Sequence, residues 1–145
     1  IGGWMWGGTD EAESIRTIQS APDHGITLID TAPVYGFGRS EEIVGKAVKQ
    51  GGLRDKVALA TKCALEWDAK ERVARNATKN RILKEADDSL RRLGTDYIDL
   101  LQIHWPDPNV DMYETASAMA TLREQGKIRA VGVSNFTPAV SKKML

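Results

Sequence analysis

Short apolar runs alternate with amphipathic segments along this chain. Four runs have the length and content of buried strands, at residues 26–30, 56–61, 97–103 and 127–133. In the segments between them, apolar residues recur every three or four positions, which predicts helices at residues 10–21, from about 40 to 50, 78–93, 113–125 and from 138 onward. Strands that alternate with amphipathic helices are typical of a parallel sheet with right-handed crossovers. The predicted fold class is therefore α/β.

Cap residues refine the predicted helix boundaries. Asp10, with Glu13 three positions later, has the pattern of a capping box. Ser40 is predicted to cap the second helix, and Thr137 the last one. Residues 63–77 are predicted to form a polar loop, and loops of that length in compact domains are often functional.

The predicted helix at residues 78–93 is rich in charge. Acidic and basic side chains lie at helical spacing on it, where they can form ion pairs: Glu85, Asp87, Asp88, Arg91 and Arg92. We therefore predict a solvated helix face here and not a binding patch.

Composition narrows the class of function. The 145 residues are 41% hydrophobic and 28% charged, which is ordinary for a globular protein. Twenty basic residues balance twenty acidic ones, so no net charge favours nucleic acid or an acidic membrane surface. A single cysteine, Cys63, excludes an internal disulfide and predicts a cytoplasmic, reducing location. We expect no membrane span, and His24, His104 and Cys63 make no metal site.

Reactive side chains follow each predicted strand. Asp30 ends the first strand with Tyr35 just beyond it, Lys62 ends the second, His104 ends the third, and the dipeptide 134–135 (Ser-Asn) ends the fourth. Each has an ordinary structural explanation: a cap, packing, a solvated lysine, a structural histidine. Because the carboxyl ends of strands in a parallel α/β barrel form one face, we expect these groups to share one site.

Their chemistry suits proton donation to an oxygen. A phenol, with a reference pKa of about 10, becomes a better proton donor beside an ammonium, which stabilises the phenolate. Lys62 could supply that ammonium, and Asp30 could hold it charged. His104, as a neutral imidazole, could orient a substrate oxygen. Such a set fits hydride attack on a carbonyl, for which a nicotinamide cofactor would supply the hydride.

Four motifs give the chain a family resemblance. They are Asp30-Thr31-Ala32-x-x-Tyr35-Gly36, then Thr61-Lys62, then Gly94-x-Asp96-Tyr97-Ile98-Asp99-Leu100 leading to His104-Trp105-Pro106, and finally Gly126-Lys127-Ile128-Arg129-x-x-Gly132-Val133-Ser134-Asn135-Phe136. In this order they resemble the aldo-keto reductases. The resemblance implies an NAD(P)H-dependent carbonyl reductase on a (β/α)₈ TIM barrel.

The resemblance also implies a role for each site residue. Tyr35 would be the general acid, Lys62 and Asp30 would tune it, and His104 would position the carbonyl of a small-molecule substrate. Asp30, Ser134 and Asn135 would contact the cofactor, with NADP expected and NAD not excluded. The indoles near the substrate pocket would be Trp4, Trp6 and Trp105.

The resemblance covers only part of a barrel. A closed barrel has eight strands, and residues 1–145 supply about four βα units, so they are predicted to be a single partial domain, the N-terminal half. Its partner would be the remaining half, covering an inward face predicted to hold Leu28, Leu59, Leu100, Leu101 and Val131. The alternatives are a cofactor-binding regulatory subunit of the same fold, or an inactive fragment.

Overall fold

The computed structural model describes residues 10–142, and its main sheet is parallel. Its strand order is β1 (Leu28–Asp30), β2 (Ala58–Cys63), β5 (Ile98–Ile103) and β6 (Ile128–Val133). The helices are α1 (Glu11–Ser20), α2 (Arg39–Gln50), α3 (Lys79–Leu93), α4 (Met112–Glu124) and α5 (Pro138–Ser141), with a 3₁₀ turn, η1 (Ala21–His24). The predicted parallel α/β class is confirmed, and every predicted strand and helix is present.

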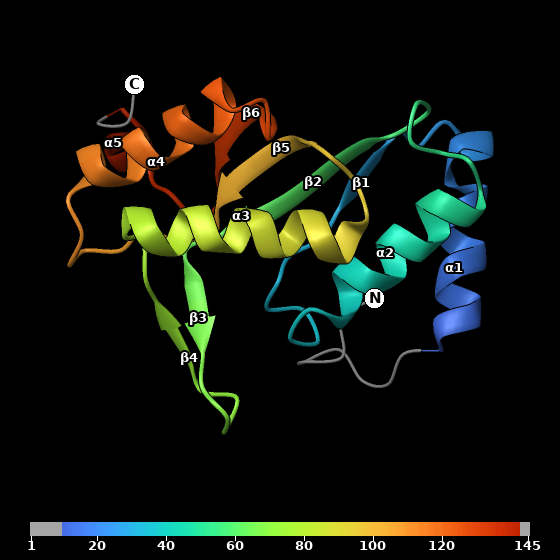
Figure 1. The fold of residues 1–145 in the computed structure, drawn as a ribbon, viewed down its shortest axis with the longest axis horizontal. Helices are drawn as coiled ribbons and strands as arrows, with labels where there is room; N and C mark the ends of the chain where they lie inside the picture. The colour runs from blue at the N-terminus through green and yellow to red at the C-terminus, as the bar shows by residue number, and fades with distance from the viewer. Residues whose placement is uncertain (1–9, 143–145) are drawn as a thin grey trace.

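The core lies between one face of this sheet and the helices that cross it (Figure 1). Alternate residues of the central strands, such as Leu59 and Leu101, point into it, as do Ile82 of α3 and Leu122 of α4. All four are at most 1% exposed. Burial of apolar surface on one side therefore fixes which strand positions face the helices and which face the other way.

Strand register corrects the predicted inward face. Thr61 pairs with Leu101, which pairs with Val131, so these residues lie in one row, on the helix side. Leu59 belongs to the same side. The prediction is wrong for Leu59, Leu101 and Val131, because side chains on a strand alternate with a period of two. It is right for Leu28 and Leu100, which lie on the opposite face with Asp30.

The predicted caps hold at two helices and fail at a third. The carboxylate of Asp10 accepts the N–H of Glu13 at 2.9 Å, and Thr137 caps α5 through Val140. Ser40 does not cap α2, because the helix begins at Arg39 after Gly38, whose φ of 101° is the left-handed conformation that glycine tolerates. The Ser40 hydroxyl lies in the first turn and is hydrogen-bonded to the Thr31 hydroxyl at 2.8 Å.

Residues 63–77 are not the polar loop that was predicted. They contain an antiparallel hairpin, β3 (Leu65–Trp67) and β4 (Val73–Arg75), which projects away from the main sheet (Figure 1). The Trp67 ring packs 5.5 Å from that of Phe37, and Leu65 belongs to a small second core. Strands of three residues carry too little alternation to be recognised in a sequence.

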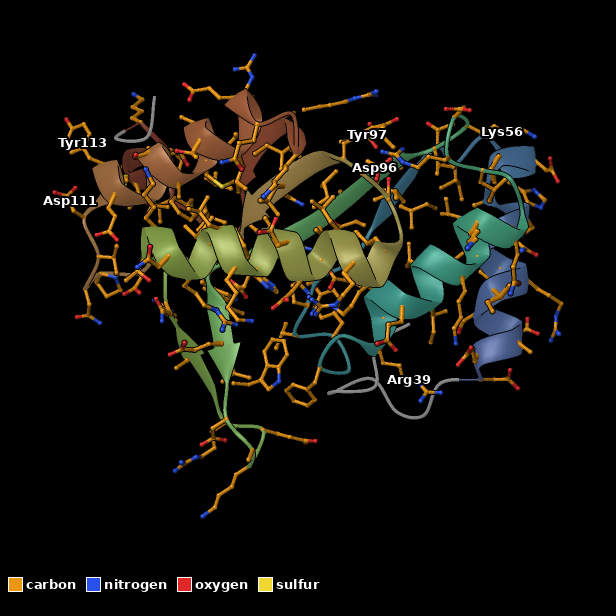
Figure 2. All side chains as sticks on the ribbon, viewed as in Figure 1. Arg39, Lys56, Asp96, Tyr97, Asp111 and Tyr113 are labelled. Carbon is orange, nitrogen blue, oxygen red and sulfur yellow. The ribbon has the colours of Figure 1, made fainter. Side chains whose placement is uncertain are left out.

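The charged helix α3 is only partly solvated. Asp87 and Arg91 are exposed as predicted, and Tyr113 and Asp111 at the start of α4 likewise extend outward (Figure 2). The prediction is wrong for Glu85, which is buried, and for Arg92, which is mostly covered. These two side chains point toward α2 and β2.

Candidate active site

Strand register brings Asp30 and Lys62 together. Asp30 pairs with Ala60, two residues before Lys62, so both side chains lie on the face of the sheet away from the helices. The Lys62 Nζ lies 2.6 Å from Asp30 Oδ2 and 2.9 Å from the carbonyl oxygen of Thr31. The lysine side chain is only 7% exposed, so the carboxylate supplies the charge compensation that a desolvated ammonium needs.

Tyr35 lies close to Lys62 and to His104. It belongs to the turn that follows β1, where its N–H donates to the carbonyl of Ala32 at 3.1 Å. The Lys62 Nζ is 5.1 Å from the centroid of the Tyr35 ring. The rings of Tyr35 and His104 meet edge-on, with centroids 5.8 Å apart and planes at 84°. The structure therefore brings together the four side chains predicted to form one site.

His104 is buried at the carboxyl end of β5. Its backbone N–H donates to the carbonyl of Cys63 at 2.9 Å, which continues the pairing of β5 with β2. Burial and, less strongly, the charge of Lys62 together lower the pKa of His104 from 6.5 to about 4, against the opposing charge of Asp30. The imidazole is therefore neutral at neutral pH and has one N–H to donate.

Gln102 is a site residue that sequence reasoning missed. Its Nε2 donates to Asp30 Oδ1 at 3.0 Å, so the two oxygens of Asp30 are held by Lys62 and by this amide. Gly132 leaves room for it, since a Cβ at that position would lie 3.0 Å from the Gln102 Cγ. The signal was available, because Gln102 on β5 is two residues before His104, which directly follows that strand and continues its pairing.

Ser134 and Asn135 lie beside His104 at the end of β6. The Ser134 N–H donates to the carbonyl of Ile103 at 2.8 Å. The Asn135 amide donates to the carbonyl of His104 at 2.8 Å and to the Ser134 hydroxyl at 3.0 Å. Both residues therefore lie next to the end of β5, where His104 lies. Their contact with a cofactor remains a prediction.

One predicted indole can be located. Trp105 is 39% exposed, and its ring lies 5.4 Å from the guanidinium carbon of Arg75 on β4. A cavity of about 410 Å³ lies between the hairpin and the end of β5, and its lining includes Val73, His104 and Trp105. The role of Trp105 in substrate binding stays a prediction. Trp4 and Trp6 lie outside the described residues.

Two further features concern residues 10–142 only. No helix in this range is long and apolar enough to cross a membrane. Within the same range, no cluster of three or more His, Cys, Asp or Glu side chains is arranged to hold a metal ion.

A parallel α/β sheet with polar side chains gathered at the carboxyl ends of its strands is the arrangement of barrel enzymes. The family model for the aldo/keto reductase family matches residues 1–145. The chain belongs to this family, so the resemblance given by its motifs is confirmed. The predicted TIM-barrel fold, of which the chain carries about four βα units, is confirmed with it.

Two curated relatives show how much of the family's length the chain covers. An aldo-keto reductase of Bacillus subtilis (strain 168), YhdN, is 63% identical over 94% of this chain and 41% of its own length. The NADH-specific methylglyoxal reductase of Escherichia coli (strain K12) is 40% identical over 92% of this chain and 45% of its own length. The chain spans less than half the length of these relatives.

This chain also covers less than half the length of similar proteins whose structures are solved. The glycerol dehydrogenase AKR11B4 of Gluconobacter oxydans has a TM-score of 0.89 and 52% identity over 99% of this chain and 45% of its own. An aldo-keto reductase of Klebsiella pneumoniae in complex with NADPH has a TM-score of 0.78 and 36% identity, over 91% of this chain and 42% of its own.

Proposed function

We propose that the full-length protein is a nicotinamide-dependent oxidoreductase that reduces an aldehyde or ketone to an alcohol. One observation carries the proposal: the Tyr35 ring lies close both to the ammonium of the Lys62–Asp30 ion pair and to the neutral imidazole of His104. A phenol between a cation and a neutral hydrogen-bond donor suits protonation of a carbonyl oxygen.

Tyr35 is the general acid of this proposal. As negative charge develops on the carbonyl oxygen, the phenol gives it a proton and becomes a phenolate. The ammonium of Lys62 stabilises that phenolate. Asp30 pairs with this ammonium at 2.6 Å and compensates its charge, since the lysine side chain is only 7% exposed.

His104 orients the substrate. Because its pKa is lowered to about 4, it remains neutral through the physiological range and donates a hydrogen bond to the carbonyl oxygen without competing as an acid. The cavity beside His104 and Trp105 supplies a place for the rest of a small-molecule substrate.

The nicotinamide cofactor of this proposal binds at the end of β6. When bound, the reduced cofactor supplies the hydride. The hydroxyl of Ser134 and the amide of Asn135 have the chemistry to bind its carboxamide, and Asp30 completes the contact from β1. Of the proteins similar to this chain, one is crystallised with NADPH and another is named NADH-specific. We propose NADP as the cofactor and test NAD beside it.

We further propose that residues 1–145 form the N-terminal half of one barrel domain, whose remaining half supplies the other walls of the site. The chain's coverage of less than half of each relative supports this division. A cytoplasmic location agrees with the free, buried thiol of Cys63.

A turnover assay tests the function. The full-length protein is mixed with an aromatic aldehyde and either NADPH or NADH, and cofactor oxidation is followed by absorbance. We expect saturable turnover with NADPH and a lower kcat/KM with NADH. Binding of cofactor without turnover of any aldehyde or ketone in a panel would instead indicate a regulatory subunit of this fold.

A further inference from the structure

Two buried carboxylates lie behind the strand that carries Lys62. Glu41 of α2 is 0% exposed, and Glu85 of α3 is 3% exposed. Carboxylates are buried so completely only where they are paired or hydrogen-bonded, because desolvation of a charge is costly. Both contact the carboxyl end of β2 from the helix side, opposite the face where Lys62 meets Asp30.

Glu41 holds the residue immediately before Lys62. The Thr61 hydroxyl donates to Glu41 Oε1 at 2.6 Å, and the Arg92 Nε donates to Glu41 Oε2 at 2.6 Å. Thr61 is fully buried and, by the alternation of the strand, points toward the helices while Lys62 points away from them. The contact therefore anchors β2 to α2 at the residue next to Lys62, on the face opposite the lysine side chain.

Glu85 holds the residue two positions after Lys62. The Ala64 N–H donates to Glu85 Oε2 at 2.7 Å, and Arg81 bridges Glu85 to the carbonyl of Leu65. Ala64 has a φ of 74°, a left-handed conformation that is unfavourable for a residue with a Cβ. A strained turn persists only where its surroundings determine it, and here Glu85 and Arg81 do so.

The Asp30 side of the ion pair is tied to α2 as well. The carbonyl of Thr31 accepts from the Lys62 Nζ at 2.9 Å, and the Thr31 hydroxyl is hydrogen-bonded to Ser40, the neighbour of Glu41. The first turn of α2 therefore contacts both strands that meet at the ion pair.

We propose that Glu41, through Thr61, and Glu85, through Ala64, are positioning residues for Lys62, and that their contacts hold its ammonium against Asp30. The inference rests on the proposed function for its effect on turnover. Neither glutamate touches substrate or cofactor. Both act from the helix side of β2, so their loss displaces Lys62 without removing any group from the site.

The first variant is Thr61→Val in the full-length protein. Valine keeps the shape of threonine and removes only the hydroxyl that reaches Glu41. Because a displacement of about 1 Å in an active site can cost about 100-fold in rate, we expect kcat per folded molecule to fall about 10- to 100-fold, with the pH profile of kcat altered and cofactor affinity unchanged. Thr61→Ser, which keeps the hydroxyl, should restore kcat and the profile.

A second readout does not depend on turnover. In protein labelled with ¹³C-lysine, the Cε resonance of Lys62 is assigned by its loss in Lys62→Met. We expect this resonance to move in Thr61→Val and to keep its wild-type position in Thr61→Ser. If no carbonyl is reduced but the resonance moves, the proposed function fails and the positioning inference stands.

Glu85→Gln is a second, independent test of the inference, and it can be used even if Thr61→Val does not fold. The amide keeps the size of the glutamate but cannot accept from both Arg81 and Ala64, so we expect kcat to fall and the Lys62 resonance to move. Asp88→Asn is the matched control, because Asp88 lies on the same helix and pairs with Lys84 and Arg91 of that helix. A lowered melting temperature with wild-type kcat, pH profile and Lys62 resonance in Thr61→Val or Glu85→Gln would overturn the inference.

Discussion

In the proposed reduction, the hydroxyl of Tyr35 donates the proton to the carbonyl oxygen. We expect Tyr35→Phe in the full-length protein to lower kcat by about 10²–10⁴-fold, the usual contribution of general acid catalysis. Phenylalanine keeps the ring that packs against His104, so the site itself should remain intact. Steady-state kinetics with NADPH measures the loss.

Cofactor binding is the control for Tyr35→Phe. Quenching of NADPH fluorescence should give the wild-type dissociation constant, because the hydroxyl is proposed to act on the substrate only. A variant that retains wild-type kcat would remove Tyr35 from its role, and one that loses cofactor binding would show that the ring has a wider structural function.

Lys62 supplies the charge beside that phenol. We expect Lys62→Met to lower kcat strongly across the whole pH range, because methionine keeps the packing of the stem but leaves a developing phenolate without its cation. It also leaves Asp30 without its ion-pair partner. The pH–rate profile is the measurement, and a profile identical to wild type would mean that the lysine does not act on the phenol.

His104 is predicted to stay neutral until the solution is strongly acidic. Its pKa is lowered to about 4 by burial and by the charge of Lys62, so its ring resonances should not titrate between pH 5 and pH 8. Proton NMR of the ring, assigned with His104→Gln, tests this. In Lys62→Met the titration should move upward, because one of the two causes is gone.

The sequence predicted correctly which of the reactive residues lie close together. Asp30, Lys62 and His104 follow strands, and the parallel sheet places strand ends together, so their proximity could be predicted from position alone. Gln102 and Glu41 could not be recognised as easily. Their importance depends on which way a side chain points and on partners far along the chain, and neither glutamine nor glutamate is unusual in such segments.

Glu85, buried on α3, makes the stability of the fold depend on pH. Burial, with a smaller contribution from the charge of Glu41, raises its pKa from 4.5 to about 7 against the opposing charge of Arg81 and the hydrogen bond from Ala64. At a pH between these two pKa values, Glu85 is protonated in the folded state and ionised in the unfolded state, so the folded state binds more protons. The free energy of unfolding should therefore fall by about 3 kcal/mol as the pH rises through that interval.

Glu85→Gln isolates this effect. Denaturant unfolding of the full-length protein at pH 5 and pH 8 should show the loss in wild type and a much smaller one in the variant, since glutamine does not titrate. Glu42→Gln, which removes the same charge from an exposed position of α2, is the control and should follow wild type. Equal slopes in wild type and Glu85→Gln would mean that Glu85 is already ionised at pH 5.

Helices and strands were predictable to different degrees. The long, periodic helix α3 and the four parallel strands were found because burial of one face imposes a period that the sequence displays. The hairpin at residues 63–77 was missed because its strands are short and its stability comes from contacts such as Phe37 with Trp67, which join distant segments. The Ser40 cap was assigned wrongly because Gly38 ends the preceding turn in a conformation that needs no side chain.

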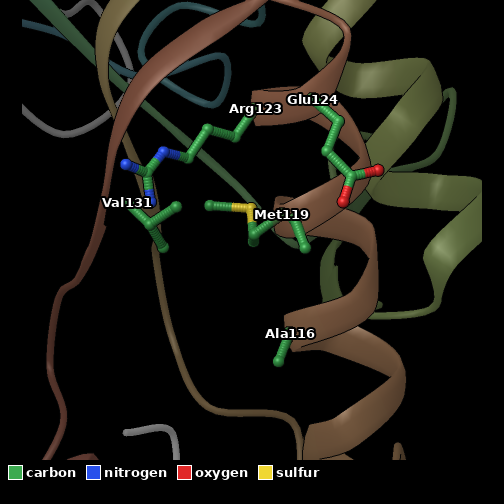
Figure 3. A pocket seen from close by; sticks show the side chains of 6 residues that line it. Ala116, Met119, Arg123, Glu124 and Val131 are labelled. Atoms are coloured by element: carbon green, nitrogen blue, oxygen red, sulfur yellow. The ribbon is translucent and has the colours of Figure 1, made fainter.

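The described sheet leaves apolar surface uncovered at both of its edges. Leu28 on β1 is 52% exposed, and Ile26, two residues before that strand, is 54% exposed. Beside β6, a groove of about 560 Å³ runs between Val131 and Met119 on α4, with Arg123 and Glu124 at its rim (Figure 3). Exposed strand edges and apolar grooves of this kind favour association with other chains.

We therefore expect residues 1–145, expressed alone, to associate or aggregate and to fail to bind nicotinamide cofactor. The remaining half of a barrel would cover these surfaces in the full-length protein. Sedimentation velocity and NADPH fluorescence measure the two properties, with the full-length protein as the control. A monomer that binds NADPH tightly would show that this half folds independently and holds most of the cofactor site.

The alternation of Thr61 and Lys62 also bears on how this chain can change over generations. The two residues are neighbours in sequence but serve opposite sides of the sheet, so inserting or deleting one residue earlier in β2 would exchange them, leaving the lysine among the helices. The turn at residues 68–72 has no such constraint, because it lies at the tip of a projecting hairpin. Natural variation in length should therefore accumulate at that tip, where it reshapes the surroundings of the cavity without disturbing the strand beneath it.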